Sequence, residues 1–564
     1  MRLTTIYRKV NSLFESFAYL IALWNLLILF FEPVVNNYLI IREAQTWTAF
    51  INLLFIVIAL ILRFNSLPFQ EHRQKTISDL FILIFGSLLF LYDAKFVIFF
   101  LLVRQTFFIA KYFFFHAFEG ALYKRLVKNP PITFLLSFAT TILTGSILLM
   151  LPSATVSHKI TPFIDALFTA TSATCVTGLT VVDTGSYYSL FGQLVILVLI
   201  QIGGLGIMTI STAFAVLLGQ QLTLKVENVM QNVMGEGMKF DMLAMVKNVV
   251  LLTLIIEAIG AFLLYFTFNK LYEPIQAFYY SVFHSISAFC NAGFGLYSDN
   301  FIKYAFNFNI NFTITVLIIL GGLGFSVIID LYNHAVKKNR RYSLSLHTKI
   351  VVSTTAFLLL FGTIAFLISE FNHTMKGFAV HQRLLCSWFQ SVTCRTAGFN
   401  TIDESQISHS TSLVSIILMF IGASPGSTGG GVKTSTFALL LLSIFAMMKG
   451  QTDLTVFKRK IGLRSIREST SLITLSIITI CIIVFIILMI DPFTLEQTMF
   501  EAVSAFGTVG LSMGITPNLS SVSKFLIVLL MYIGRVGPLT VLFAFSLRKK
   551  ELHYSLPEEK IAIG

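Results

Sequence analysis

The stretch Thr174-Cys175-Val176-Thr177-Gly178-Leu179 decides the fold, because the chain contains a similar stretch four times. The other copies are Phe289-Cys290-Asn291-Ala292-Gly293-Phe294, Cys394-Arg395-Thr396-Ala397-Gly398-Phe399 and Phe506-Gly507-Thr508-Val509-Gly510-Leu511. We call these four stretches the glycine phrases. Each lies between two long apolar segments, which indicates four similar structural units.

The residues before each phrase follow a common pattern. Ten residues before the shared glycine there is an aromatic residue, at Phe168, Phe283, Trp388 and Phe500. Six residues before it there is Ser172, Ser287, Val392 or Ser504. We expect a short helix to lead into each phrase, and the glycine to allow backbone torsions that a Cβ would hinder.

Four such phrases held between membrane helices would form a ring of backbone carbonyl oxygens. Such a ring replaces the water shell of a permeating cation and suits a large, weakly hydrated one such as potassium. The residues expected to line it are Val176, Thr177, Gly178, Asn291, Ala292, Gly293, Thr396, Ala397, Gly398, Thr508, Val509 and Gly510. Since the phrases differ outside the glycine, the ring should hold fewer well-formed sites than four identical phrases would.

The composition is that of a membrane protein. Of the 564 residues, 56% are hydrophobic and 12% are charged, which excludes a soluble domain and a disordered chain. The formal charge of +13 would also fit a nucleic-acid-binding protein, but the basic residues cluster between the apolar segments. That is the pattern of cytoplasmic loops, so no nucleic acid partner is expected.

The predicted fold class is an all-α, polytopic membrane protein. Four parallel repeats, each a helix, a re-entrant pore helix and a second helix, would surround one central pore, because the basic inter-unit loops give every unit the same orientation. The repeats are expected at 129–220, 221–335, 336–450 and 451–564, with spans at 132–151, 192–218, 248–268, 308–331, 349–370, 408–448, 469–490 and 523–547. The extension 1–128 would add about four transmembrane helices, near 13–31, 47–63, 79–92 and 95–117.

The second span of each unit contains a further small-residue motif, which begins at Gly203, Gly321, Gly422 and Gly534. At Gly203 and Gly321 we interpret it as close helix packing, since small residues let helix backbones approach each other. The third copy cannot form a continuous helix, because the stretch 422–433 is rich in glycine and contains a proline. Irregular backbone inside a membrane is tolerated only where protein buries it or water lines it.

This irregular stretch is the candidate gate beneath the carbonyl ring. Its expected residues are Gly422, Ser424, Pro425, Gly426, Ser427, Thr428, Gly429, Gly430, Gly431 and Lys433. In the fourth copy Arg535 replaces a glycine, and an ionisable residue inside a span is a functional candidate by default. Facing the pore, its charge would repel cations. The alternatives are a simple helix break and an arginine satisfied structurally between helices.

Acidic residues follow three of the phrases and are candidates for an outer mouth that concentrates cations. They are Asp183, Asp299, Asp403 and Glu404, and the alternative is a solvated loop surface. No covalent cofactor and no enzymatic activity are expected. The stretch Gly426 to Thr434 resembles a phosphate-binding loop, but Val432 separates its last glycine from Lys433.

The longest motifs resemble the Trk/Ktr/HKT superfamily of potassium transporters, and most closely its bacterial, TrkH-related KtrB type. They are Gln390 to Thr401, Phe500 to Ser512, the stretch 422–436 and the ending Pro557 to Gly564. The resemblance implies potassium uptake. It places Gly178, Gly293, Gly398 and Gly510 in the selectivity filter, and 422–433 with Arg535 in the gate. The extension 1–128 is a departure from the KtrB type.

The resemblance also implies partners and a location. Family members usually work as homodimers in the lipid of the bacterial inner (plasma) membrane, with a cytosolic ring of RCK-type, nucleotide-binding regulatory subunits. Gly178 resembles the potassium-selective members, whereas serine there goes with sodium-selective plant relatives. Potassium ions are therefore expected, with sodium an open alternative as the coupling ion of a symporter. A sodium or mixed-cation pathway is the alternative function, and a non-conducting membrane scaffold is the alternative from another class.

Overall fold

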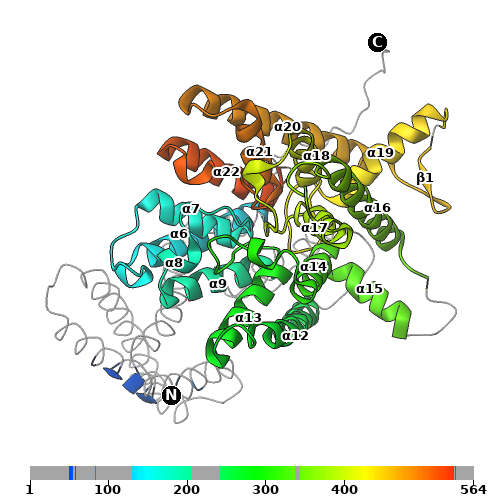
Figure 1. Cartoon of the computed structure of the whole chain (residues 1–564). Coiled ribbons are helices and arrows are strands. Elements are labelled where there is room, and N and C mark those ends of the chain that lie inside the picture. Colours follow the sequence, from blue (N-terminus) through cyan, green and yellow to red (C-terminus); the bar gives the residue numbers. More distant parts are fainter. Residues whose placement is uncertain are drawn as a thin grey trace, which may run out of the picture.

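The computed structural model shows a mostly helical protein (Figure 1). It describes residues 130–205, 242–336, 343–451, 453–538 and 540, together with separate helical positions between 47 and 83. The helices expected before residue 129 lie largely outside these residues. So do the ends of the expected spans 192–218 and 523–547, and the C-terminal motif.

The helices fall into four groups along the chain. The first comprises α6 (Pro130–Met150), α7 (Phe163–Thr174), α8 (Thr184–Tyr187) and α9 (Leu190–Gly204). The second comprises α12 (Met242–Phe268), α13 (Pro274–Phe289), α14 (Phe308–Leu323) and α15 (Phe325–Val336). The third comprises α16 (Leu346–Ser369), α17 (Val380–Thr393), α18 (His409–Phe420) and α19 (Thr434–Met448). The fourth comprises α20 (Leu463–Ile490), α21 (Leu495–Gly507) and α22 (Ser521–Val536).

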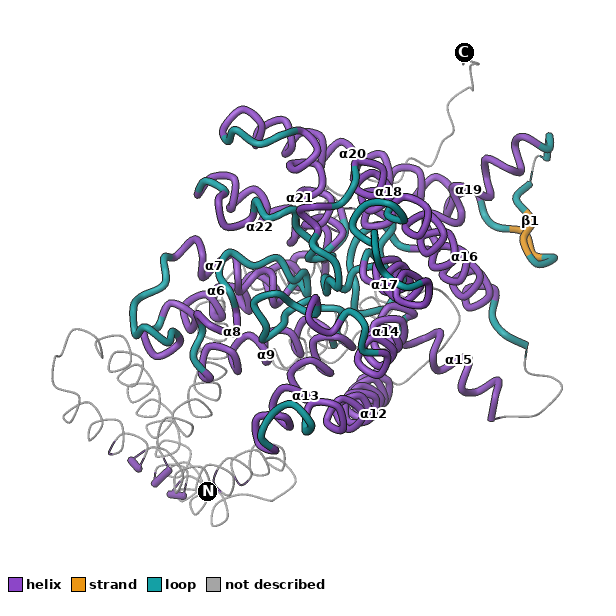
Figure 2. The backbone as a smooth tube through the Cα atoms, in the orientation of Figure 1, coloured by secondary structure: helices purple, strands orange, loops and turns teal. Residues whose placement is uncertain are grey.

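Short elements connect these helices, and Figure 2 separates the connecting loops from the helices by colour. Four 3-10 turns are η1 (Pro152–Ala154), η2 (Ile302–Tyr304), η3 (Glu404–Gln406) and η4 (Thr516–Asn518). The strands β1 (Thr455–Val456) and β2 (Arg459–Lys460) form an antiparallel hairpin between α19 and α20, with Thr455 opposite Lys460.

The four groups pack in a closed circle. In the first, second and fourth groups the three long helices all contact one another, as α20, α21 and α22 do, and in the third group α16 contacts both α17 and α18. Between groups, α9 packs on α13, α14 on α17, α18 on α21, and α22 returns to α7. Figure 1 shows the groups following one another around a common centre, from cyan through green and yellow to red.

Three described helices are long and apolar enough to cross a membrane, namely Lys247–Phe268, Leu346–Ser369 and Leu463–Ile490. The expected single span 308–331 is wrong in detail, because α14 and α15 meet at an angle of 100°. Gly324 lies at the bend with a φ of +94°, a torsion that glycine adopts without steric cost. Small residues that the sequence suggested only for packing thus also break this helix.

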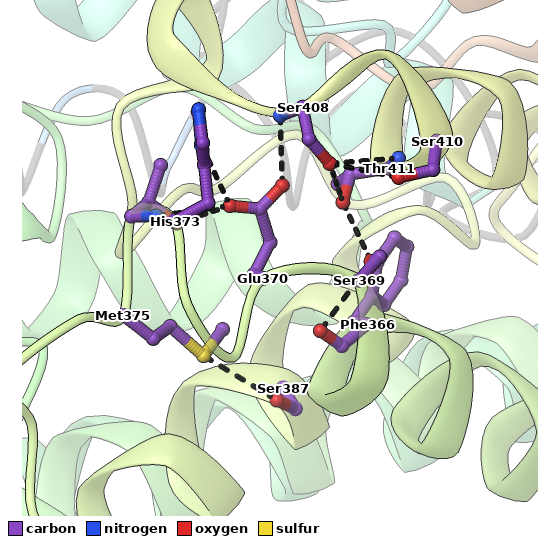
Figure 3. Close-up of polar contacts among 10 residues, drawn as sticks. Phe366, Ser369, Glu370, His373, Met375, Ser387, Ser408, Ser410 and Thr411 are labelled. Atoms are coloured by element: carbon purple, nitrogen blue, oxygen red, sulfur yellow. Dashed lines mark hydrogen bonds and ion pairs between the residues drawn. The ribbon is translucent and has the colours of Figure 1, made fainter.

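Buried carboxylates fix the outer ends of two groups. Glu370, directly after α16, accepts a hydrogen bond from the Ser408 N–H at 2.8 Å, and Ser408 caps the start of α18 (Figure 3). Asp491, directly after α20, accepts one from the N–H of Ser520 at 3.2 Å, and Ser520 caps α22. Each acid therefore ties the first helix of its group to the start of the inner helix.

Candidate functional site

The glycine phrases follow directly on the C-terminal ends of α7, α13, α17 and α21. The aromatic residues noted in the sequence anchor these short helices, since Phe168, Phe283 and Phe500 are fully buried. The C-terminal end of a helix carries the negative end of its dipole. All four helices therefore favour a positive charge beside the phrases.

The backbone takes the same unusual conformation in every phrase. Two residues of each phrase have a positive φ, namely Val176 (58°) and Gly178 (95°), Asn291 (60°) and Gly293 (71°), Thr396 (72°) and Gly398 (74°), and Thr508 (51°) and Gly510 (96°). The residue between each pair does not. The four phrases therefore share one backbone conformation, which glycine adopts without steric cost at the second position of each pair.

The four glycines form a ring in the order of the sequence. A Cβ built on Gly178 would lie 2.6 Å from the carbonyl oxygen of Ala292 in the next phrase, and one on Gly293 would lie 2.9 Å from that of Ala397. The remaining close approaches are from Gly398 to the carbonyl of Val509 and from Gly510 to that of Thr177. Any side chain at these positions would strike the neighbouring phrase. The structure thus brings together eight of the twelve residues predicted to line the ring, namely Thr177, Gly178, Ala292, Gly293, Ala397, Gly398, Val509 and Gly510.

Serine side chains hold three of the phrases from behind. The bonds are Ser172 Oγ accepting from Gly178 N–H at 3.0 Å, Ser504 Oγ accepting from Gly510 N–H at 3.1 Å, and Ser287 Oγ donating to the Phe294 carbonyl at 2.8 Å. The third phrase has the buried Val392 at this position, and the neighbouring Thr393 supplies the hydroxyl instead, since its Oγ1 donates to the Phe399 carbonyl at 2.5 Å. The serine that recurs in the sequence therefore supports the backbone of its own phrase.

The sequence analysis missed a second set of hydrogen bonds, which join each short helix to the loop that follows its glycine phrase. Each short helix carries a buried polar residue that binds the loop after its phrase. The pairs are Thr169 with the hydroxyl of Tyr188, His284 with the N–H of Leu296, Gln390 with Glu404, and Glu501 with Ser512. A polar residue eight or nine positions before each glycine is the signal that could have identified them.

The predicted outer-mouth acids occupy different environments. Asp183 and Asp403 accept hydrogen bonds from nearby backbone N–H groups, and Asp299 lies 3.7 Å from Lys303. Glu404 is buried, and its Oε1 accepts from Gln390 Nε2 at 2.7 Å. Burial raises the pKa of Glu404 to about 7. Its carboxyl therefore lies within the protein and not on the loop surface.

The glycine-rich loop, residues 421–433 between α18 and α19, lies where the phrases begin. It folds back on itself through a bond from Gly422 N–H to the Val432 carbonyl at 2.9 Å. Gly430 N–H donates to Thr508 Oγ1 in the fourth phrase at 2.9 Å, and Thr428 Oγ1 donates to the carbonyl of Phe289 in the second at 3.3 Å. The loop therefore contacts neighbouring phrases directly.

Two cationic side chains, both named in the sequence analysis, lie at this loop. The buried guanidinium of Arg535 donates to the carbonyls of Thr428 and Gly203, so it links the loop to the end of α9. Lys433 Nζ donates to the carbonyl of Gly429 at 2.7 Å. Within the described ranges, neither side chain has a carboxylate at ion-pair distance. Both side chains are therefore held by backbone carbonyls at the loop.

A further buried cation, Arg395, was missed by the sequence analysis. Arg395, inside the third phrase, directs its guanidinium to the carbonyls of Thr355 and Gly422 at 3.5 Å. The signal that could have identified it is a charged residue within an otherwise neutral motif. Arg395 thus contacts the start of the glycine-rich loop from the phrase side.

The small-residue motif packs the inner helices against the phrases. A Cβ on Gly203, Gly321 or Gly534 would strike the carbonyl of Thr174, Phe289 or Phe506, respectively. Each of these carbonyls belongs to the first residue of a phrase. The packing interpretation therefore holds at Gly203 and Gly321, and it extends to Gly534. Gly422 differs, because its neighbour is Gly430 of its own loop.

The oxygen ligands available at this site are backbone carbonyls. In the part of the chain that the structure describes, no group of three or more His, Cys, Asp or Glu side chains could hold a metal ion. The cysteines at the phrases, Cys175, Cys290 and Cys394, are buried free thiols. The close approaches around the four glycines are therefore made by backbone carbonyl oxygens.

Comparison with known proteins places the chain among membrane transporters. A family model described as cation transport protein, TrkH, matches residues 103–553. The Ktr system potassium uptake protein B of Bacillus subtilis is 38% identical over 439 residues, which cover 77% of this chain and 97% of that protein. The potassium/sodium uptake protein NtpJ of Enterococcus hirae is 40% identical over 435 residues, which cover 76% of this chain and 95% of that protein.

A solved structure shares the fold. The crystal structure of the potassium transporter TrkH from Vibrio parahaemolyticus matches with a TM-score of 0.60 at 14% sequence identity. The match covers 97% of this chain and 99% of that one.

Proposed function

Because the chain belongs to the TrkH family of cation transport proteins, we propose that it takes up potassium ions through a channel-like pore with a four-part carbonyl filter. The protein is a multi-pass membrane protein of a transporter family, and the predicted relationship to the Trk/Ktr/HKT superfamily is confirmed. The observation that carries the proposal is the ring in which Gly178, Gly293, Gly398 and Gly510 each approach the next phrase.

The filter would work by replacing water around the ion. Carbonyl oxygens at close quarters exchange for the hydration shell, and this exchange favours large, weakly hydrated potassium over sodium. The dipoles of α7, α13, α17 and α21 would stabilise the ion further. The surface acids Asp183, Asp299 and Asp403 would raise the cation concentration at the outer entrance.

The gate would be the glycine-rich loop together with Arg535. The loop's bonds to Phe289 and Thr508 support its position directly below the filter. The charges of Arg535 and Lys433 would oppose a cation leaving the filter toward the cytoplasm. Opening then requires the loop to move and its bond with Arg535 to break.

Control of the gate would come from a cytosolic, RCK-type regulatory subunit acting on a homodimer in the bacterial plasma membrane. The B. subtilis relative is named as part of a Ktr system, which favours such a partner. The basic segments 335–349 and 449–467 are the expected docking surface. Lys349 Nζ lies 5.8 Å from the ring centroid of Phe457 at the β1–β2 hairpin, so the two segments meet.

A sodium or mixed-cation pathway is the second candidate. It is favoured by the E. hirae relative, whose name includes both potassium and sodium. The two candidates share one architecture and differ only in ion preference, so competition between the ions separates them.

The test is growth rescue of a bacterium that lacks its own potassium uptake systems, with rubidium uptake measured in the same cells. We expect rescue on low potassium by the full-length chain. Rescue should be lost when Gly293 or Gly398 is replaced by leucine, since each glycine approaches the next phrase. Gly377→Leu is the matched control, because Gly377 also has a positive φ but no neighbour within 4 Å of a built Cβ.

Three results would decide among the candidates. Uptake that persists in both filter variants would exclude this ring as the pathway. Rubidium uptake abolished more strongly by sodium than by potassium would favour the mixed-cation alternative. A chain that is expressed but moves neither ion, in cells or in liposomes with its regulatory subunit, would support a scaffold role.

A further inference from the structure

The third glycine phrase is held differently from the other three. In the first, second and fourth phrases the residue before the glycine donates its N–H to the serine carbonyl five positions earlier, at 2.7, 2.7 and 2.8 Å. In the third phrase Ala397 N–H instead reaches the Thr393 carbonyl, four positions earlier, at 3.0 Å. Val392 offers no hydroxyl here, and Thr393 takes the place of the serine, since its Oγ1 donates to the Phe399 carbonyl. The third phrase is therefore held by its own short helix one residue out of step with the others.

The loop after the second phrase supplies an additional support. Asn300 Nδ2 donates to the carbonyl of Gly398 at 3.4 Å, and Phe301 N–H donates to the carbonyl of Asn400 at 3.1 Å. The rings of Phe301 and Phe399 also pack with centroids 5.3 Å apart. The third phrase is therefore held from the neighbouring group of helices.

Asn300 adopts an uncommon conformation to make this contact. Its φ is +52°, in the left-handed region that asparagine tolerates better than most residues. Its N–H donates to the Tyr297 carbonyl at 3.1 Å, which fixes the turn. The Nδ2 group must face Gly398, because a carbonyl can only accept, and Oδ1 is buried without a hydrogen-bond partner. The side chain of Asn300 therefore acts as an N–H donor to the carbonyl of Gly398.

We propose that Asn300 is a specificity-determining residue, which fixes the carbonyl of Gly398 in the position that favours potassium over sodium. This inference rests on the proposed function. A carbonyl oxygen has two lone pairs, so a bond to Asn300 leaves one for the ion. Selectivity depends on the field and the flexibility of the coordinating carbonyls. A carbonyl that is held outward cannot close around a smaller ion.

Two substitutions remove the donor in different ways. Asn300→Gly deletes the amide while allowing the left-handed backbone, and Asn300→Asp keeps the shape but offers only acceptors. Ser298→Ala, on an exposed residue of the same loop, is the matched control. The measurement is rubidium uptake by cells that express each full-length chain, with the sodium and potassium concentrations that halve it.

We expect both Asn300 variants to lower the ratio of half-inhibiting sodium to half-inhibiting potassium about fivefold, which equals about 1 kcal/mol for one neutral hydrogen bond. The Ser298→Ala ratio should match that of the original chain. An unchanged ratio in Asn300→Gly, or loss of both variants from the membrane, would overturn the inference. If the original chain itself shows no uptake that potassium inhibits, the proposed function fails instead.

Discussion

The guanidinium of Arg535 on α22 donates to the backbone carbonyl of Thr428 in the glycine-rich loop. This bond joins the fourth group of helices to the loop of the third. Because Arg535 also reaches the carbonyl of Gly203, and Thr428 Oγ1 that of Phe289, one pair of residues connects all four groups. If the loop moves away from Arg535, the bonds that link the four groups must therefore break.

Replacing Arg535 with alanine should raise flux through the protein in the absence of a regulatory subunit. Loss of about 2 kcal/mol from hydrogen bonds to a charged group would shift the closed-to-open ratio about 30-fold. The measurement is rubidium uptake into liposomes that contain the chain alone. Deletion of 427–431 should have the same effect. If uptake falls or stays unchanged in a correctly folded variant, the gate assignment is wrong.

Replacing Gly178 with serine should lower potassium uptake and raise the relative uptake of sodium. Gly178 has a φ of +95°, and a Cβ there would lie 2.6 Å from the Ala292 carbonyl, so the ring must deform. Uptake of rubidium and of sodium should be compared in the same cells. Gly377→Ser is the control, because Gly377 has a φ of +92° but no neighbour within 4 Å. Equal effects in both variants would point to backbone strain and not to the filter.

The original chain should lose stability as the pH rises from acid to neutral, and replacing Glu404 with glutamine should remove this loss. Burial, together with the nearby Asp403 and Glu370, raises the pKa of Glu404 from 4.5 to about 7, despite an opposing hydrogen bond from Gln390. In that window the folded protein keeps a proton that the unfolded chain releases, so the free energy of unfolding falls as pH rises.

The measurement for Glu404 is thermal unfolding in detergent at several pH values. The Glu404→Gln protein should melt several degrees higher than the original at about pH 8 and nearly together with it at about pH 5. Asp299→Asn, in the loop after the second phrase, is the control and should not change this dependence. Parallel curves for the original chain and Glu404→Gln would contradict the prediction.

Replacing Glu370 with glutamine should destabilise the protein at neutral pH. Burial would raise the pKa of Glu370, but hydrogen bonds from Thr411, Ser408 and Thr374 outweigh it and lower the pKa to about 2. The stabilisation is therefore present above about pH 4.5 and is lost as pH falls toward 2. Losing hydrogen bonds to a charged group should cost about 1.5–3 kcal/mol.

The test for Glu370 is again the melting temperature in detergent, at neutral and acid pH. The deficit of Glu370→Gln should be largest near neutral pH and shrink as pH falls. Ser410→Ala, at an exposed hydroxyl beside Ser408, should melt with the original chain (Figure 3). A deficit that is independent of pH would show that the carboxylate charge is not what stabilises this end of α16.

The sequence alone identified features that depend on local composition. Apolar segments, recurring glycines and a glycine-rich break are properties of neighbouring residues, so the membrane class and the helix break at 421–433 could be recognised without coordinates. The relationship to the Trk/Ktr/HKT superfamily, now confirmed, rests on the same local motifs.

Only the tertiary structure decided which residues from distant parts of the chain meet. It showed that Gly178 lies beside Gly293 and that the buried Glu404 accepts a hydrogen bond from Gln390. It also showed that Asn300 contacts the third phrase. It also divided the expected span 308–331 at Gly324. The physical reason is that these contacts join residues from different helices, and packing of the whole circle of helices sets their distances. A pattern of neighbouring residues in the sequence cannot predict which distant residues will be in contact.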